Sequence, residues 1–120
     1  IVRMTNTYME SRDQTFEDML AGVDDGIYAK GSLGGQTNTE MFTFSAEEAY
    51  KIKDGKICEQ VRDVVLTGNV FETLMNIDAI GNDRVLFGGL GGCGKGGQSP
   101  LRVSDGGPHT RIKDVTIGGR

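Results

Sequence analysis

Glycine is the feature that most constrains how this chain can fold. Nineteen of its 120 residues are glycine, and they gather at positions 31–35, 88–97 and 106–107. This is about twice the usual share of glycine in a globular domain. Only two residues are proline, and runs with the alternation of β-strands separate the clusters. Glycines arranged in this way are typical of turns and breaks between strands rather than of disorder.

Two short stretches have helical instead of strand periodicity. Apolar residues recur at helical spacing across residues 16–23, and Gly26 is placed to end that helix. Asn69 is a good N-cap for a second helix over residues 70–77, with Gly81 as its stop. The apolar face of each helix predicts packing against a core.

The stretch between these helices alternates in the manner of β-strands from Glu40 to Val61. Asp54-Gly55 within it is a strong hairpin signal, so we expect the tip of a long hairpin there. Residues 46–49 could also form a local helix. Residues 30–35, which include two adjacent glycines, are interpreted as a flexible segment.

Shorter strands complete the expected fold. Candidate strands lie at residues 63–67, 84–87, 100–103 and 111–117. This order of elements predicts an α+β fold: a mainly antiparallel β domain, sandwich or barrel-like, with two short helices packed on it.

The composition excludes several classes of protein. Thirteen Lys and Arg against seventeen Asp and Glu give a net charge of −4 with interspersed signs, so we expect no nucleic-acid partner. Apolar runs are too short for a signal peptide or a membrane span. Two cysteines, Cys58 and Cys93, are too few for a secreted disulfide framework, which favours a reduced, cytoplasmic setting. Because the chain starts at Ile1 inside a strand-like run, we expect residues 1–120 to be one domain of a longer protein whose N-terminal part is absent.

The segment densest in possible chemistry is the glycine cluster around Cys93. Residues 89–95 fit the G-x-x-x-x-G-K half of a phosphate-binding loop, but Gly96 stands where that loop needs Ser or Thr, and no helix can begin at the following residues. A nucleotide site is therefore not expected. A cysteine on bare backbone can serve as a zinc ligand, and Lys95 would favour its thiolate form. The alternative is a small buried hydrophobic residue.

Eight short sequence blocks carry a family resemblance. They are Arg3-Met4-Thr5-Asn6-Thr7-Tyr8-Met9, Gly26-Ile27-Tyr28-Ala29, Gly34-Gly35-Gln36, Glu48-Ala49-Tyr50, Leu66-Thr67-Gly68, Ile80-Gly81-Asn82-Asp83, Cys93-Gly94-Lys95-Gly96-Gly97-Gln98 and Val115-Thr116-Ile117-Gly118-Gly119. In this order, and over almost the whole chain, they resemble the C-terminal domain of the TldD/PmbA family, also called the modulator of DNA gyrase family. The block at Cys93 is similar to the TldD type more than to PmbA (TldE), which lacks the zinc-binding residues.

The resemblance implies a cytoplasmic zinc metallopeptidase that degrades or processes small or unfolded peptides. In such proteins a His-Glu-x-x-x-His helix supplies two zinc ligands and a general base, and a cysteine supplies the third ligand. By this comparison Cys93 is the metal ligand. The chain contains no His-Glu-x-x-x-His motif and hence none of the catalytic residues, so we expect it to bind no zinc and to be inactive on its own.

The resemblance also implies a peptide cleft and a partner. Family members are thought to hold an unfolded peptide as an added strand, and Gly34, Gly35, Gln36, Gly94 and Lys95 are the candidate substrate-binding residues. For the glycine pair, a plain turn is the alternative. A PmbA/TldE-like subunit or a second copy of the protein is the expected partner in a dimer. The alternative function is a non-catalytic PmbA/TldE-like subunit or a peptide-binding interaction module.

The sole histidine, His109, follows a Gly-Gly-Pro turn, and we expect it to be solvated. A zinc site made of Cys58, Cys93 and His109 would require three distant segments to meet and is not expected. Cys58 is interpreted as an inert strand residue.

Overall fold

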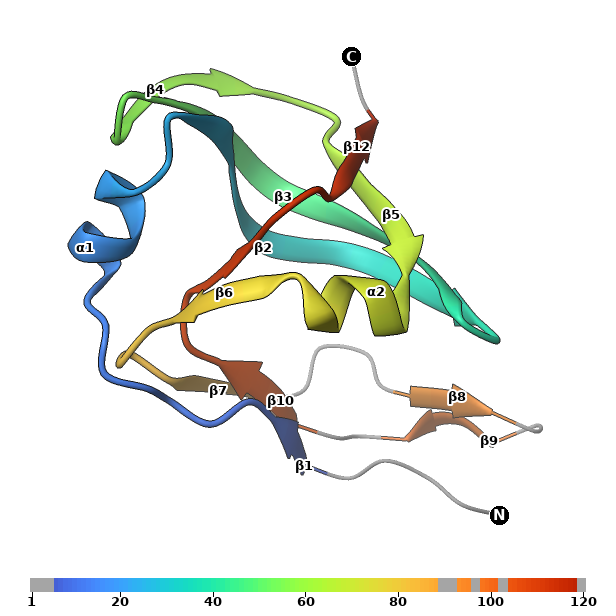
Figure 1. The fold of residues 1–120 in the computed structure, drawn as a ribbon. Coiled ribbons are helices and arrows are strands. Elements are labelled where there is room, and N and C mark those ends of the chain that lie inside the picture. The colour runs from blue at the N-terminus through green and yellow to red at the C-terminus, as the bar shows by residue number, and fades with distance from the viewer. Residues whose placement is uncertain (1–5, 89–92, 96–97, 102–103, 119–120) are drawn as a thin grey trace. The chain divides into compact units, whose positions relative to one another are not determined.

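The computed structural model describes residues 6–88, 93–95, 98–101 and 104–118 (Figure 1). Antiparallel strands dominate, two short helices accompany them, and the largest sheet stays open instead of closing into a barrel. The predicted α+β class with a mainly antiparallel sheet is therefore confirmed. The described part contains no helix long and apolar enough to cross a membrane. The chain divides into two compact units, Ile1–Phe16 with Ile80–His109 and Glu17–Ala79 with Thr110–Arg120.

The larger unit is built on a five-stranded sheet. Its elements are α1 (Phe16–Ala21), β2 (Asp25–Asn38), β3 (Met41–Lys53), β4 (Lys56–Val61), β5 (Val65–Asn69), α2 (Val70–Met75), β6 (Ile77–Ile80), β11 (Thr110–Ile112) and β12 (Thr116–Gly118). The strand order is β12-β5-β3-β2, and β4 also pairs with β3. β6 and β11 form a separate two-stranded sheet. The long β2–β3 hairpin is the pair of blue-green ribbons in Figure 1.

The segment expected to be flexible is part of β2. Residues 30–35 pair with β3, and the register shifts between Ser32 and Gly34 to leave Leu33 as an extra residue. Gly34 has a φ of +136° and its N–H donates to the Ser32 hydroxyl at 3.1 Å. Such a bulge absorbs one residue without ending the strand, which is why the prediction of a flexible segment is wrong.

The predicted hairpin tip at Asp54-Gly55 is confirmed. Lys53 pairs with Lys56, and both tip residues have positive φ, at 51° and 74°, as a tight hairpin turn needs. Residues 46–49 lie within β3 and are not helical. Ala46 and Ala49 are buried there. With Met19, Ile52, Val64 and Ala79 they form the buried apolar core.

Both helices end earlier than predicted. α1 ends at Ala21, where Arg111 meets its last turn: Nη1 donates to the Met19 carbonyl at 2.9 Å, and Nε donates to Asp78 at 2.7 Å. A cation that bonds to a terminal carbonyl stabilises a helix end, so Gly26 is not the stop and lies in β2. α2 ends at Met75, because residues 77–80 pair as a strand with β11. Gly81 is therefore not its stop.

The start of α2 is as predicted. The Asn69 side-chain oxygen accepts from the N–H groups of Phe71 at 2.9 Å and Glu72 at 3.1 Å. The Asn69 amide donates to the Glu40 carboxylate at 3.1 Å. These bonds satisfy helix N–H groups that have no partner inside the helix.

The smaller unit contains β1 (Asn6–Tyr8), β7 (Val85–Gly88), β8 (Cys93–Lys95), β9 (Gln98–Leu101) and β10 (Ser104–Gly107). β10 pairs in parallel with β1 and antiparallel with β7, while β8 and β9 form a hairpin. The strand predicted at residues 84–87 corresponds to β7, and the one at 100–103 overlaps β9. The strand predicted at 111–117 is two strands, β11 and β12, separated near Asp114, which has a φ of 57°.

Replacing Asn69 with Ala removes the cap of α2 and should lower the free energy of unfolding by about 1 kcal/mol. Urea unfolding of the purified protein measures the change. Asn69→Ser keeps an oxygen that can cap the helix and should stay within a few tenths of a kcal/mol of the parent. Equal losses in the two variants would show that the cap contributes nothing.

Candidate functional site

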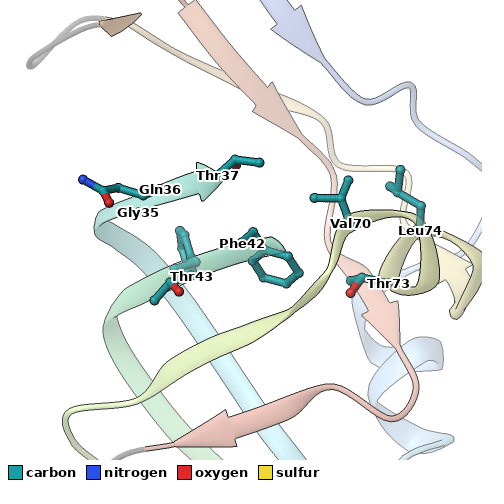
Figure 2. A pocket seen from close by; sticks show the side chains of 9 residues that line it. Gly35, Gln36, Thr37, Phe42, Thr43, Val70, Thr73 and Leu74 are labelled. Carbon is teal, nitrogen blue, oxygen red and sulfur yellow. The ribbon is translucent and has the colours of Figure 1, made fainter. Parts of the chain in front are cut away.

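A groove of about 420 Å³ opens on the larger unit between the end of the β2–β3 hairpin and α2. Figure 2 shows the side chains that line it. They come from three elements: residues 35–37 of β2, residues 42–44 of β3, and Val70, Thr73 and Leu74 of α2. None of these residues is charged, so the groove is a surface for apolar or neutral groups.

Strand pairing positions the residues that form the floor of the groove. Thr37 pairs with Phe42 and Gly35 with Phe44, so these residues share one face of the hairpin. Phe42 is half-buried and its ring lies toward α2, while Val70 and Leu74 lie on the side of α2 that borders the groove (Figure 2). Leu74 is 54% exposed. The apolar face predicted for residues 70–77, to which Leu74 belongs, is expected from the sequence to pack on a core; periodicity alone does not distinguish a core from an open groove.

Two of the predicted substrate-binding residues line this groove. Gly35 and Gln36 belong to its wall, and Gly34 precedes them in the bulge of β2. A Cβ atom on Gly35 would lie 2.5 Å from the Thr43 carbonyl oxygen, which is too close for any side chain. The glycine pair is therefore not a plain turn, because it is part of a paired strand. Its role in binding peptide stays a prediction.

The remaining predicted residues lie in the smaller unit. Cys93, Gly94 and Lys95 form β8, in which Cys93 pairs with Leu101 and Lys95 with Gln98. Their side chains lie outside the part of the structure that is described. The assignment of Cys93 to zinc and of Gly94 and Lys95 to substrate therefore remains a prediction.

His109 is not the solvated turn residue that the sequence predicts. Its ring stacks on Phe16 at 4.3 Å between centroids, and its Nδ1 lies 2.5 Å from the Asp83 carboxylate. The His109 N–H donates to the same carboxylate at 3.0 Å. Only about a third of each side chain, 35% for His109 and 36% for Asp83, is exposed. The two partners lie far from His109 in the sequence, so no local pattern could reveal them.

These bonds alter the acidity of Asp83. The backbone N–H of His109, and then its imidazole ring, favour the charged carboxylate and hold the pKa of Asp83 below its usual value of 3.8. The two residues form a clamp, in which Asp83 of the segment after β6 bonds to His109, the residue before β11. It orients the imidazole and joins two segments of the smaller unit.

Metal-binding side chains do not gather in the described part of the chain. Among the described residues, no three His, Cys, Asp or Glu side chains lie close enough to hold an ion. Cys58 is exposed on β4, where its thiol lies 3.5 Å from the Lys56 carbonyl oxygen. It belongs to the larger unit, whereas His109 belongs to the smaller one.

Residues 1–119 match the family described as the PmbA/TldA metallopeptidase C-terminal domain. The chain belongs to this family. The resemblance inferred from the eight sequence blocks is thereby confirmed. The match covers both compact units as one stretch of sequence.

Curated relatives of this PmbA/TldA domain are named as metalloproteases. One is "Metalloprotease slr0863" from Synechocystis sp., 54% identical over 99% of this chain and 26% of the relative. Another is "Zinc metalloprotease TldD homolog" from Saccharolobus solfataricus, 34% identical over 99% of this chain and 26% of the relative. The chain thus spans about a quarter of the length of these proteins. The crystal structure of TldE from Thermococcus kodakarensis has a TM-score of 0.71 and covers 93% of this chain and 23% of its own, at 22% identity, a likeness of fold alone.

Replacing Gly35 with Ala should lower the free energy of unfolding by about 1–3 kcal/mol, because the added methyl group would overlap the Thr43 carbonyl oxygen. Gly118→Ala is the matched control, since nothing lies within 4 Å of a Cβ there. We expect its effect to stay within about 0.5 kcal/mol. Thermal unfolding measures both. A Gly35→Ala variant as stable as the control would contradict the close approach of β2 and β3.

The Asp83–His109 clamp predicts an acid-sensitive contribution to stability. A carboxylate whose pKa is lowered by folding stabilises the protein above its unfolded pKa, and this contribution is lost as the pH falls through the folded pKa. The parent should therefore be more stable than Asp83→Asn at pH 7, and the difference should shrink once the pH falls below 3.8. Melting temperatures from pH 2 to pH 7 test this. A difference that stays constant over that range would exclude a role for the Asp83 charge.

Proposed function

We propose that the full-length protein is a cytoplasmic zinc metallopeptidase that degrades or processes small or unfolded peptides. In this proposal the present domain supplies Cys93 as one zinc ligand and residues 34–36 as part of the peptide cleft. The observation that carries the proposal is the match of residues 1–119 to a metallopeptidase domain family. The name of the Saccharolobus relative as a zinc metalloprotease supports the choice of metal.

The donor set fits a zinc site shared with another part of the protein. A thiolate is a good zinc ligand, and Cys93 lies on a short paired strand, so its backbone position is defined by Leu101 opposite. One thiolate is not a complete site, because a catalytic zinc needs three protein ligands. The other two would come from the His-Glu-x-x-x-His helix that the resemblance implies for another part of the full-length protein.

Zinc, once bound, would supply a Lewis acid and an acidic bound water for peptide hydrolysis. The part of this chain in the reaction would be to hold the metal through the Cys93 thiolate and to orient the peptide. Lys95, two residues further along β8, would favour the thiolate over the thiol by its positive charge. Gly94 between them has no side chain, which would let a peptide come close to the backbone.

A partner subunit is also part of the proposal. We propose a dimer with a PmbA/TldE-like subunit or with a second copy of the protein. Large apolar side chains of α2 support this, since Phe71 is 62% exposed and Met75 is 84% exposed. Exposed apolar side chains that adjoin one another favour contact with another protein surface.

Replacing Cys93 with Ala in the full-length protein should abolish both zinc retention and peptide hydrolysis, because one of three ligands is lost. Zinc content by atomic absorption and cleavage of a casein-derived peptide mixture measure the two losses. Cys58→Ala is the control, since Cys58 is an exposed residue of β4, and it should retain both properties.

Two outcomes would contradict this assignment. Undiminished zinc in Cys93→Ala would remove Cys93 from the site. Absence of zinc and of hydrolysis in the unaltered full-length protein would favour the alternative function, a non-catalytic PmbA/TldE-like subunit.

A further inference from the structure

The groove beside α2 ends at an open strand edge. β2 is the last strand of its sheet, and within the described residues its only strand partner is β3. All of β2 from Lys30 to Asn38 is exposed. The outer N–H and C=O groups of such an edge are able to pair with another extended chain. Residues 35–37 belong both to this edge and to the wall of the groove.

Apolar surface inside the groove is left exposed to solvent. Leu74 is 54% exposed, and Phe42 and Val70 are only half-buried. The three side chains come together from β3 and α2 (Figure 2). A volume of about 420 Å³ is within the range of small-molecule pockets and accommodates a leucine or phenylalanine side chain.

A carboxylate, that of Glu40, flanks the end of the groove where α2 begins. Glu40 lies in the β2–β3 turn, where its carbonyl oxygen accepts from the Val70 N–H at 2.7 Å and its carboxylate accepts from Asn69. Glu40 is exposed. A negative charge beside an uncharged groove disfavours an acidic ligand and favours a basic one.

We propose that this groove binds an apolar side chain of an extended peptide, and that Glu40 selects a Lys or Arg next to that side chain. The peptide backbone lies along the open edge of β2, and the apolar side chain contacts Phe42, Val70 and Leu74. The inference rests on the peptidase function proposed above, because it names the class of peptide on which that function would act.

Binding of labelled peptides to the full-length protein tests the proposal. The protein carries Cys93→Ala, so that hydrolysis does not interfere, and fluorescence anisotropy gives the dissociation constants. The probe is a seven-residue Gly/Ser peptide with a central Leu-Lys pair. Two control peptides have Ser-Lys or Leu-Glu in place of the Leu-Lys pair. We expect the Leu-Lys peptide to bind about tenfold more tightly than the Ser-Lys peptide, as burial of one leucine side chain implies.

Matched variants locate the leucine site. Leu74→Gln should bind the Leu-Lys and Ser-Lys peptides with equal affinity, because the apolar wall is lost. Met75→Gln is the control on the same helix: Met75 is 84% exposed and does not line the groove. This variant should keep the tenfold preference. Both residues are exposed, so neither replacement should disturb folding, and circular dichroism checks this. The variant Glu40→Gln should lose the preference of the parent for Leu-Lys over Leu-Glu.

The contrary outcomes are distinct from those of the zinc experiment. An equal preference for leucine in Leu74→Gln and Met75→Gln would place the leucine elsewhere and overturn the proposal. So would failure of all three peptides to bind, since the edge of β2 would then be covered by another part of the protein. Zinc binding and peptide hydrolysis by the full-length protein could persist with either of these two outcomes, so the peptidase proposal would not fail with them. Conversely, a full-length protein that lacks zinc but still shows the predicted peptide preferences would contradict the proposed peptidase function. It would support the proposed peptide-binding groove.

Discussion

The larger unit depends on the way β3 changes partners along one edge. β2 pairs with the whole length of one side, while the other side pairs with β5 through residues 41–45 and with β4 through residues 49–53. Small buried residues, Ala46 and Ala49, lie where this change occurs. Because α2 follows β5 directly, the change of partner also brings α2 beside the β2–β3 hairpin. The groove is thus a consequence of β3 pairing.

Features with a local cause could be predicted from the sequence. The Asp54-Gly55 turn and the Asn69 cap each depend on two or three neighbouring residues, and both are found in the structure. Features that depend on residues remote in the sequence could not be predicted in this way. Residues 30–35 are a strand because residues 44–48 of β3 pair with them. α1 ends at Ala21, where Arg111, remote in sequence, bonds to its last turn.

The same distinction between local and distant causes applies to the candidate site. Cys93 and its glycine-rich block form a contiguous motif, so the resemblance finds them without knowledge of the fold. The groove combines residues from β2, β3 and α2, which come together only after the strands have paired. The Asp83–His109 clamp shows the same limit, because Pro108 and the glycines before it predict a turn and carry no information about Asp83 or Phe16.

The parallel pairing of β1 with β10 has a consequence for the order of folding during synthesis. β1 precedes its partner strand at residues 104–107 by almost a hundred residues, so it leaves the ribosome well before that partner. The β2–β3–β4–β5 part of the larger unit needs only contacts between strands that lie within residues 25–69, so it can form well before that. Residues 6–8 therefore cannot pair with β10 until residues 104–107 have been made, and during that interval their strand edge is open to other chains. A chaperone that shields residues 6–8 during that interval would improve the yield of folded protein.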